Sequence, residues 1–257
     1  MYRVVTLAAA TVFCAFAASA QLSAAEIKIL SPGSTESALS ALIPQFEKTS
    51  GHTITIDYGP VGALAARIGK GEAADIAILS EPATADLRKR GKLVAGSEVV
   101  IAKVGIGVFV RKGDPKPDIS SAETFLLALT RAKTIAYADP KLGGSTSILV
   151  GELMHSLDIT GAIGPKTKLV PPAKPLLDLV AGGGVDLGFN PIAEILSDPR
   201  VELVGPLPAS IQKYTSYVAS LVAGSPREDA FKALIAFLSS AEATVVLQAK
   251  GFEPKGS

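Results

Sequence analysis

Three short stretches of small and polar residues are candidates for an anion site, because each comes directly before a helical pattern. They read Ser31-Pro32-Gly33-Ser34-Thr35, Tyr58-Gly59-Pro60-Val61-Gly62 and Gly143-Gly144-Ser145-Thr146-Ser147. The first turn of a helix leaves backbone N–H groups without partners, and the helix dipole places partial positive charge there. An anion can therefore be held without any charged side chain. Hydroxyl groups add donors, and glycine lets the backbone come close to a ligand.

The candidate ligand-binding residues of these stretches are Ser31, Gly33, Ser34, Thr35, Pro60, Val61, Gly62, Gly143, Gly144, Ser145 and Thr146. The same residue types also have a structural interpretation. Serine and threonine cap helices, and glycine and proline form tight turns. The sequence leaves both interpretations open.

Motifs of enzyme catalysis are mostly missing from the sequence. It contains no G-x-S-x-G elbow, no phosphate loop of the Walker type and no G-x-G-x-x-G fingerprint. The stretch Ser210-Ile211-Gln212-Lys213 matches an S-x-x-K pattern without its companion motifs, and we interpret it as a chance match. The two histidines, His52 and His155, are isolated in the sequence, so we expect no metal site. His52 is expected to be exposed in a turn. We expect neither a metal nor a cofactor.

The first 25 residues have the pattern of an export signal. Arg3 supplies the positive start, residues 4–17 are almost continuously apolar, and small residues favour cleavage after Ala20 or Ala25. Cys14 is the one cysteine and would leave with the signal, so the mature chain is expected to form no disulfide.

The charge balance argues against nucleic acid or a membrane surface as a partner. The chain has 25 basic and 24 acidic residues, and removal of Arg3 leaves 24 of each. A formal net charge near zero does not fit a polybasic surface. After the signal, no apolar run approaches the roughly 20 residues that span a bilayer. We expect an exported monomer without a membrane span.

The mature chain alternates β-rich runs with longer amphipathic runs, which predicts βαβ units on a largely parallel sheet. Strands are expected at residues 26–30, 53–58, 76–79, 134–138, 167–170 and 185–189, and helices at 35–49, 62–69, 83–90, 121–131, 143–157, 175–180 and 227–239. The runs 99–110 and 201–222 break this alternation, and we interpret them as two crossings between lobes.

The predicted fold class is therefore α/β, with two lobes, two crossover segments and a ligand cleft where loops at the carboxyl ends of strands meet. The signal occupies residues 1–25. Lobe 1 is expected at residues 26–103 plus 214–257, and lobe 2 at residues 104–213. The helix expected at 227–239 should pack on lobe 1.

Several motifs occur in an order that resembles a known family. They are the strand at 27–30 with its Ser/Gly turn, Phe46-Glu47-Lys48-Thr49-Ser50-Gly51, Ala73-Ala74-Asp75-Ile76 and Gly184-Val185-Asp186-Leu187-Gly188-Phe189. With the export signal, they resemble the periplasmic solute-binding proteins, specifically the molybdate-binding branch. The resemblance covers nearly all of the mature chain. It implies a type II binding-protein fold that closes on a small ligand and delivers it to the permease of an inner-membrane ABC transporter.

The same resemblance places ligand contacts on the turn at 31–35, on the cluster after the second strand and on a residue after the strand at 186–189. The family has hydroxyls in that cluster, where this chain reads Gly59-Pro60-Val61-Gly62. The family has a tyrosine in the last place, where this chain has Asn190. Asn190 joins the candidate ligand-binding residues on this ground, although a turn residue is expected after any strand end.

A second resemblance is to periplasmic aconitate isomerase, which is built on the same scaffold. It rests on residues 110–120 and on Ile135-Ala136-Tyr137-Ala138-Asp139. It implies a cleft that holds a polycarboxylate and isomerises it, which requires an acid/base group beside the ligand. Glu36, Glu81 and Asp139 lie near turns expected to face the cleft. Glu36 is explained equally well as an acid in the first turn of a helix, and Asp139 as a turn residue before Pro140.

The prediction is thus a periplasmic receptor of an ABC importer that binds a small anion, either an oxyanion or a di- or tricarboxylate. The alternative is an aconitate isomerase on the same scaffold.

Overall fold

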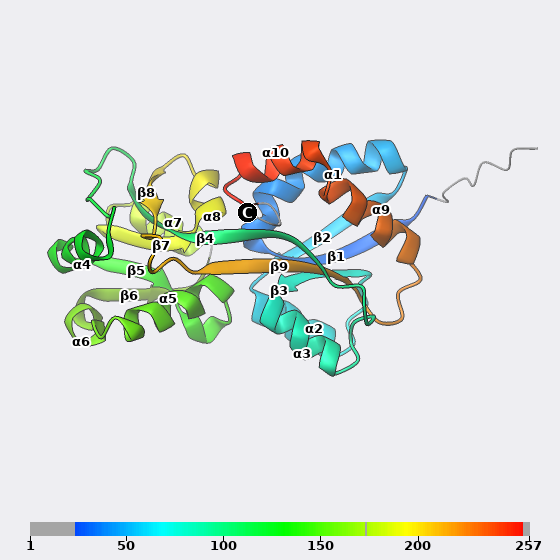
Figure 1. Ribbon diagram of the computed structural model, residues 1–257, viewed down its shortest axis with the longest axis horizontal. Coiled ribbons are helices and arrows are strands. Elements are labelled where there is room, and N and C mark those ends of the chain that lie inside the picture. Colours follow the sequence, from blue (N-terminus) through cyan, green and yellow to red (C-terminus); the bar gives the residue numbers. More distant parts are fainter. Residues whose placement is uncertain (1–23, 173, 254–257) are drawn as a thin grey trace, which may run out of the picture.

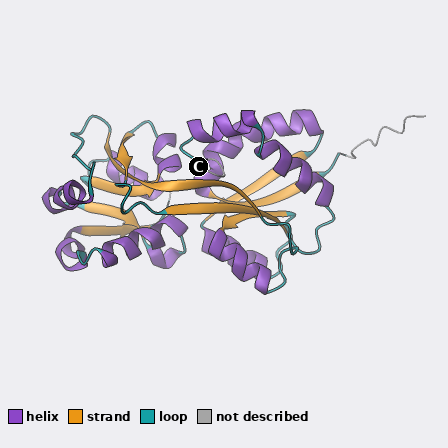
Figure 2. Cartoon of the chain, viewed as in Figure 1, coloured by secondary structure: helices purple, strands orange, loops and turns teal. Residues whose placement is uncertain are grey.

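The computed structural model describes residues 24–172 and 174–253. Residues 1–23 of the expected signal, with Cys14 and the cleavage position after Ala20, lie outside the described residues. The strands form a sheet that runs through the length of the molecule, and helices pack around it (Figure 1, Figure 2). The strands are β1 Glu26–Pro32, β2 Thr53–Gly59, β3 Ile76–Ser80, β4 Val99–Arg111, β5 Ile135–Ala138, β6 Thr167–Val170, β7 Leu187–Pro191, β8 Val201–Pro206 and β9 Tyr214–Leu221.

The helices flank this sheet on both faces (Figure 2). The α-helices are α1 Glu36–Ser50, α2 Val61–Gly69, α3 Glu81–Lys89, α4 Ala122–Arg131, α5 Ser145–Ser156, α6 Thr160–Ile163, α7 Lys174–Ala181, α8 Ile192–Ser197, α9 Glu228–Leu238 and α10 Ala241–Ala249. Three short 3₁₀ helices are η1 Gly33–Thr35, η2 Pro140–Leu142 and η3 Gly164–Lys166.

The sheet is mixed, and the expectation of a largely parallel sheet was wrong. The strand order is β2-β1-β3-β9-β4-β7-β5-β6, with β8 paired to β4. Strands β1, β2 and β3 pair in parallel, as do β5, β6 and β7, and these are the expected βαβ units. The pairs that involve β4 or β9 are all antiparallel. The reason is that these two long strands run in opposite directions through the middle of the sheet.

Strands β4 and β9 join the two lobes (Figure 1). The first part of β4, up to Gly105, pairs with β9, and the part from Ile106 onward pairs with β7 and β8. The first lobe, with β1–β3, α1–α3, α9 and α10, lies at one end of this pair, and the second lobe, with α4–α8 and β5–β8, lies at the other. The first expected crossing, 99–110, is thus the strand β4. Of the second, 201–222, only β9 crosses between the lobes, because β8 pairs with the end of β4 inside the second lobe.

Separate hydrophobic cores support the two lobes. The core of the first lobe gathers side chains from β1, β3, α1 and α2, and it includes Phe231, Leu234 and Leu238 of α9. The predicted packing of this helix on the first lobe is confirmed. The second lobe has two smaller clusters, one around Phe125 and Phe189 and one around Phe109. Ala193 of α8 belongs to the core of the first lobe, so α8 bridges the lobes.

His52 is buried, with 4% of its surface exposed, and the expectation that it is exposed was wrong. Its ring packs against Phe46, with ring centroids 6.0 Å apart. Its Nδ1 accepts a hydrogen bond from the Ala25 N–H at 3.2 Å. His52 therefore fastens the segment that precedes β1 to the end of α1. His155 lies exposed on α5.

Within the described part of the chain, no single helix has the length and apolar character needed to cross a bilayer, although α9 and α10, bent by 66°, reach that threshold as a pair.

Candidate functional site: a cavity between the lobes

A cavity of about 230 Å³ lies between the two lobes. Its walls come from the carboxyl ends of β1, β2, β5 and β7, from the segments that follow them, and from the middle of β9. The lining residues are Pro32, Gly33, Ser34, Glu36, Tyr58, Gly59, Pro60, Val61, Ala138, Gly144, Ser145, Thr146, Ser147, Pro172, Asn190, Pro191, Glu194 and Tyr217. The edge where parallel strands end is the usual ligand position of open α/β sheets.

Three helical segments begin at this cavity: η1, which continues into α1, then α2, and α5. Pro32, Pro60 and Gly144 precede them in extended conformation, and none of these residues makes a side-chain cap. No side chain caps these starts, so first-turn N–H groups other than that of Gly62, which donates to the Gly143 carbonyl, are available to an acceptor in the cavity. The structure therefore brings together the three stretches on which the anion prediction was based.

The hydroxyl groups of the lining differ in their hydrogen bonding. The Ser145 Oγ is buried without a partner among the described residues. The Ser34 Oγ and the Tyr217 hydroxyl are 2.5 Å apart, and the Thr146 Oγ1 lies 3.4 Å from the Thr215 Oγ1. A buried donor without a hydrogen-bond partner destabilises the folded protein, and a ligand oxygen that accepts its hydrogen bond would remove this cost. Ser145 is thus the hydroxyl most available to a ligand.

Four of the predicted site residues, Ser31, Thr35, Gly62 and Gly143, lie outside the lining. Ser31 and Thr35 are almost fully buried, and their hydroxyl oxygens are 2.6 Å apart. The Thr35 hydroxyl donates to the carbonyl of Pro32 at 2.7 Å, so the Ser31 hydroxyl is the donor of the pair. These two side chains hold the turn in place, while Gly33 and Ser34 between them face the cavity.

Gly62 and Gly143, also predicted site residues, contact each other across the cleft. The Gly62 N–H of the first lobe donates to the Gly143 carbonyl of the second lobe at 3.0 Å. A Cβ atom at Gly62 would lie 3.2 Å from the Gly143 Cα. Gly143 has a φ of 76°, which favours glycine. The lobes touch at this pair, so the cavity beside it is in a closed arrangement.

The remaining predicted residues, Pro60, Val61, Gly144, Thr146 and Asn190, all line the cavity. Their contact with a ligand stays a prediction. Sequence reasoning did not single out Glu194, which lies one turn after Asn190. The Asn190 Nδ2 donates to the Glu194 Oε2 at 2.7 Å.

The Glu194 carboxyl is the most perturbed acid of the cavity. Burial raises its pKa to about 7, the hydrogen bond from Asn190 lowers the pKa, and the negative charge of Glu36 raises it. Burial also raises the pKa of the Tyr217 hydroxyl, which is therefore protonated at neutral pH. A carboxyl group that titrates near neutral pH can act as an acid or a base.

Of the three acids that the sequence suggested, Glu36, Glu81 and Asp139, only Glu36 lines the cavity. The Asp139 carboxylate caps η2 by accepting from the Lys141 N–H at 2.9 Å. Glu81 borders a different hollow, beside Arg88 and Glu98.

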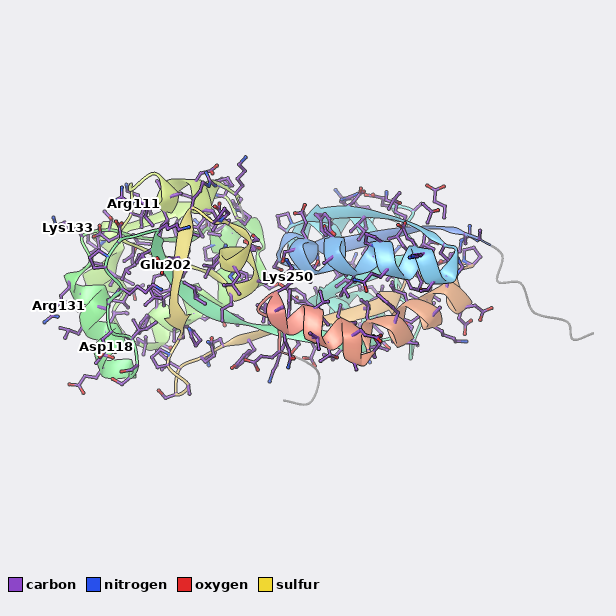
Figure 3. The ribbon with its side chains drawn as sticks, turned by 90° about the horizontal axis from the view of Figure 1, so that it is seen from above. Arg111, Asp118, Arg131, Lys133, Glu202 and Lys250 are labelled. Atoms are coloured by element: carbon purple, nitrogen blue, oxygen red, sulfur yellow. The ribbon has the colours of Figure 1, made fainter. Side chains whose placement is uncertain are left out.

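Among the described lining residues, the charged side chains are Glu36 and Glu194, and none is basic. Basic side chains of the second lobe that Figure 3 labels, such as Arg131 and Lys133, lie at its outer end, away from the other lobe. Donors to an anion in the cavity would therefore be N–H and hydroxyl groups.

Two lobes joined by a pair of long strands, with a cavity between them that carries hydroxyl, amide and carboxyl groups, define a two-lobed ligand-binding protein. The chain matches the family model of bacterial extracellular solute-binding proteins over residues 27–253, and it belongs to that family. The predicted resemblance to the molybdate-binding branch is confirmed by the comparisons that follow.

Two curated relatives align along most of the chain. The aconitate isomerase of a Pseudomonas species is 30% identical over 233 residues, which cover 89% of this chain and 87% of the relative. The molybdate-binding protein ModA of Azotobacter vinelandii is 26% identical over 256 residues, which cover 97% of this chain and 96% of the relative. Among solved structures, the sulfate-binding protein SubI of Mycobacterium tuberculosis H37Rv superposes with a TM-score of 0.75 at 20% identity, covering 90% of this chain and 88% of that chain.

Proposed function

We propose that this protein captures a small anion in the cavity between its lobes, as the periplasmic receptor of an ABC importer. The observation that carries the proposal is the convergence of three helix starts without side-chain caps on one cavity between the lobes, beside the Ser145 hydroxyl, which has no partner among the described residues. A volume of about 230 Å³ is below the roughly 300–1,000 Å³ of drug-sized ligand sites, which favours a small solute.

A di- or tricarboxylate suits this cavity better than a tetrahedral oxyanion. Pro60 and Val61 at the start of α2 offer no hydroxyl donor, and Asn190 presents an amide where the resemblance to the molybdate-binding branch implies a tyrosine. The aconitate isomerase of Pseudomonas also shares more identity with this chain than ModA does.

A thermal-shift series tests the receptor proposal. A ligand that binds only the folded protein stabilises it by mass action. We expect trans-aconitate to raise the melting temperature more than molybdate or sulfate at equal concentration. Stabilisation by molybdate alone would assign the cavity to an oxyanion and not to a carboxylate ligand. Stabilisation only by neutral solutes would overturn the anion assignment.

A second candidate function, the isomerisation of aconitate, is favoured by Glu194. In its ionised form this carboxylate would accept a proton from the methylene group of a bound aconitate and return it at the other end of the allylic system. Glu194 is the group in the cavity whose pKa suits both steps.

Incubation with trans-aconitate, followed by chromatography of the cis isomer, separates the two functions. A receptor binds trans-aconitate without turnover, because positioning a carboxylate does not move a proton. Turnover that is lost in Glu194→Gln while binding persists would establish the isomerase.

A further inference from the structure

We propose that Glu194 couples ligand capture to protons: the cleft takes up one proton on Glu194 when an anion binds, and the protonated carboxyl then donates a hydrogen bond to the anion. The inference rests on the proposed anion binding and adds a residue, a mechanism and a pH dependence to it.

The position of Glu194 is the first support. Its carboxyl lines the ligand cavity and also a neighbouring hollow of about 150 Å³, which Glu36 and Ser197 border as well. Among the described residues, only Asn190 is hydrogen bonded to it, through Oε2. The second oxygen, Oε1, is left for a proton or a ligand.

The charges around Glu194 are the second support. The turn from η1 to α1 presents Glu36, β9 presents the protonated Tyr217, and β7 presents the neutral amide of Asn190. Tyr58 of β2 lines the same cavity. The opposite side of α8 packs through Ile192 and Leu196 against Gly251, beside Lys250.

An anion in this cavity would meet two carboxylates and, among the described lining residues, no cation. Like charges in one cavity repel each other, and the repulsion is strongest where the ligand displaces water. Uptake of one proton removes the repulsion and converts a carboxylate oxygen from an acceptor into an O–H donor. The step balances simply: the carboxylate gains one proton from solvent, the anion keeps its charge, and no bond of the ligand changes.

Glu36 is the less suited of the two acids, because it is exposed to solvent, where water screens its charge. Glu194 is partly buried in α8, which packs against η1, so its ionised form is the poorly solvated one. The burial of Glu194 and the negative charge of Glu36 both raise the pKa of Glu194, so Glu194 is prepared to take up a proton near neutral pH.

Isothermal titration calorimetry with trans-aconitate and with molybdate, in two buffers of different ionisation enthalpy, tests this inference. Both probes are fully ionised from pH 7.5 to pH 9.0, so any proton taken up goes to the protein. With a pKa of about 7, the protonated fraction of Glu194 falls about 25-fold over this range, and the Kd should rise by the same factor. At pH 9.0 the buffer dependence should show uptake of about one proton per anion bound.

Glu194→Gln keeps an oxygen to accept from Asn190 and adds a permanent N–H donor. We expect it to bind the same probe with a Kd that changes less than twofold across the range and with no proton uptake. Glu36→Gln is the matched control: it retains proton uptake, with the affinity profile moved to lower pH, because the charge of Glu36 raises the pKa of Glu194.

Binding without proton uptake in the native protein would overturn the role of Glu194 and leave the anion site intact. Failure of both probes to bind the native protein at either pH would overturn the anion site and this inference together.

Discussion

Closure of the cleft should depend on the absence of a side chain at Gly62. Its N–H donates to the Gly143 carbonyl at 3.0 Å, and an added Cβ would lie 3.2 Å from the Gly143 Cα and 3.3 Å from the carbonyl oxygen. Both atoms are backbone, so in Gly62→Ala the lobes must separate slightly. Weakening one neutral hydrogen bond costs about 0.5–1.5 kcal/mol. Since the ligand binds the closed state, the Kd should rise about fivefold for a cost of about 1 kcal/mol.

Calorimetric titration of Gly62→Ala with trans-aconitate measures this change, and small-angle X-ray scattering without ligand should show a larger radius of gyration. The variant should not unfold more easily, because alanine is the better helix former in α2, by up to about 1 kcal/mol. Gly164→Ala is the control, since a Cβ at the exposed Gly164 meets nothing within 4 Å. An affinity for Gly62→Ala within twofold of that of the native protein would refute the closure argument.

Three further changes test individual side chains. Ser145→Ala should weaken anion binding by about 1.5–3 kcal/mol in a calorimetric titration, without lowering the melting temperature, because its hydroxyl has no partner among the described residues; an unchanged Kd would remove Ser145 from the site. Tyr217→Phe should lower the free energy of unfolding in urea by about 1 kcal/mol through loss of the bond to Ser34, and an unchanged value would show that this bond contributes nothing. The pKa of Glu194 is raised on folding, so its stabilising contribution is complete below pH 4.5 and is lost as pH rises to 7; relative to Glu194→Gln, the native protein should lose about 3 kcal/mol over that interval, and parallel stability curves would contradict this.

The sequence predicted the positions of the helix starts around the cavity because these depend on local signals. Proline or glycine after an apolar run, followed by helical spacing, marks the beginnings of α2 and α5. The sequence did not predict which hydroxyl of the first turn faces the cavity. Ser31, Ser34 and Thr35 are the same kind of donor, and only the geometry of η1 turns Ser34 inward and pairs the other two.

Glu194 was missed for a physical reason. Helix α8 is six residues long, which is too short for apolar periodicity to show. The burial of Glu194 also depends on packing between α8 and the first lobe, far away in the sequence. The antiparallel pairing of β4 with β9 is likewise a tertiary feature, and a strand pattern alone carries no information on its direction.

The anion site itself is tested most directly by calorimetric titration of the native protein with trans-aconitate, molybdate and sulfate at pH 7.5, repeated with Ser145→Ala. We predict saturable binding of one anion per chain, tightest for trans-aconitate, with at least a tenfold higher Kd in Ser145→Ala, the fold-change that corresponds to about 1.4 kcal/mol. Saturable binding of a neutral solute with none of the three anions bound, or anion binding that Ser145→Ala leaves unchanged, would contradict the assignment of the cavity as the anion site.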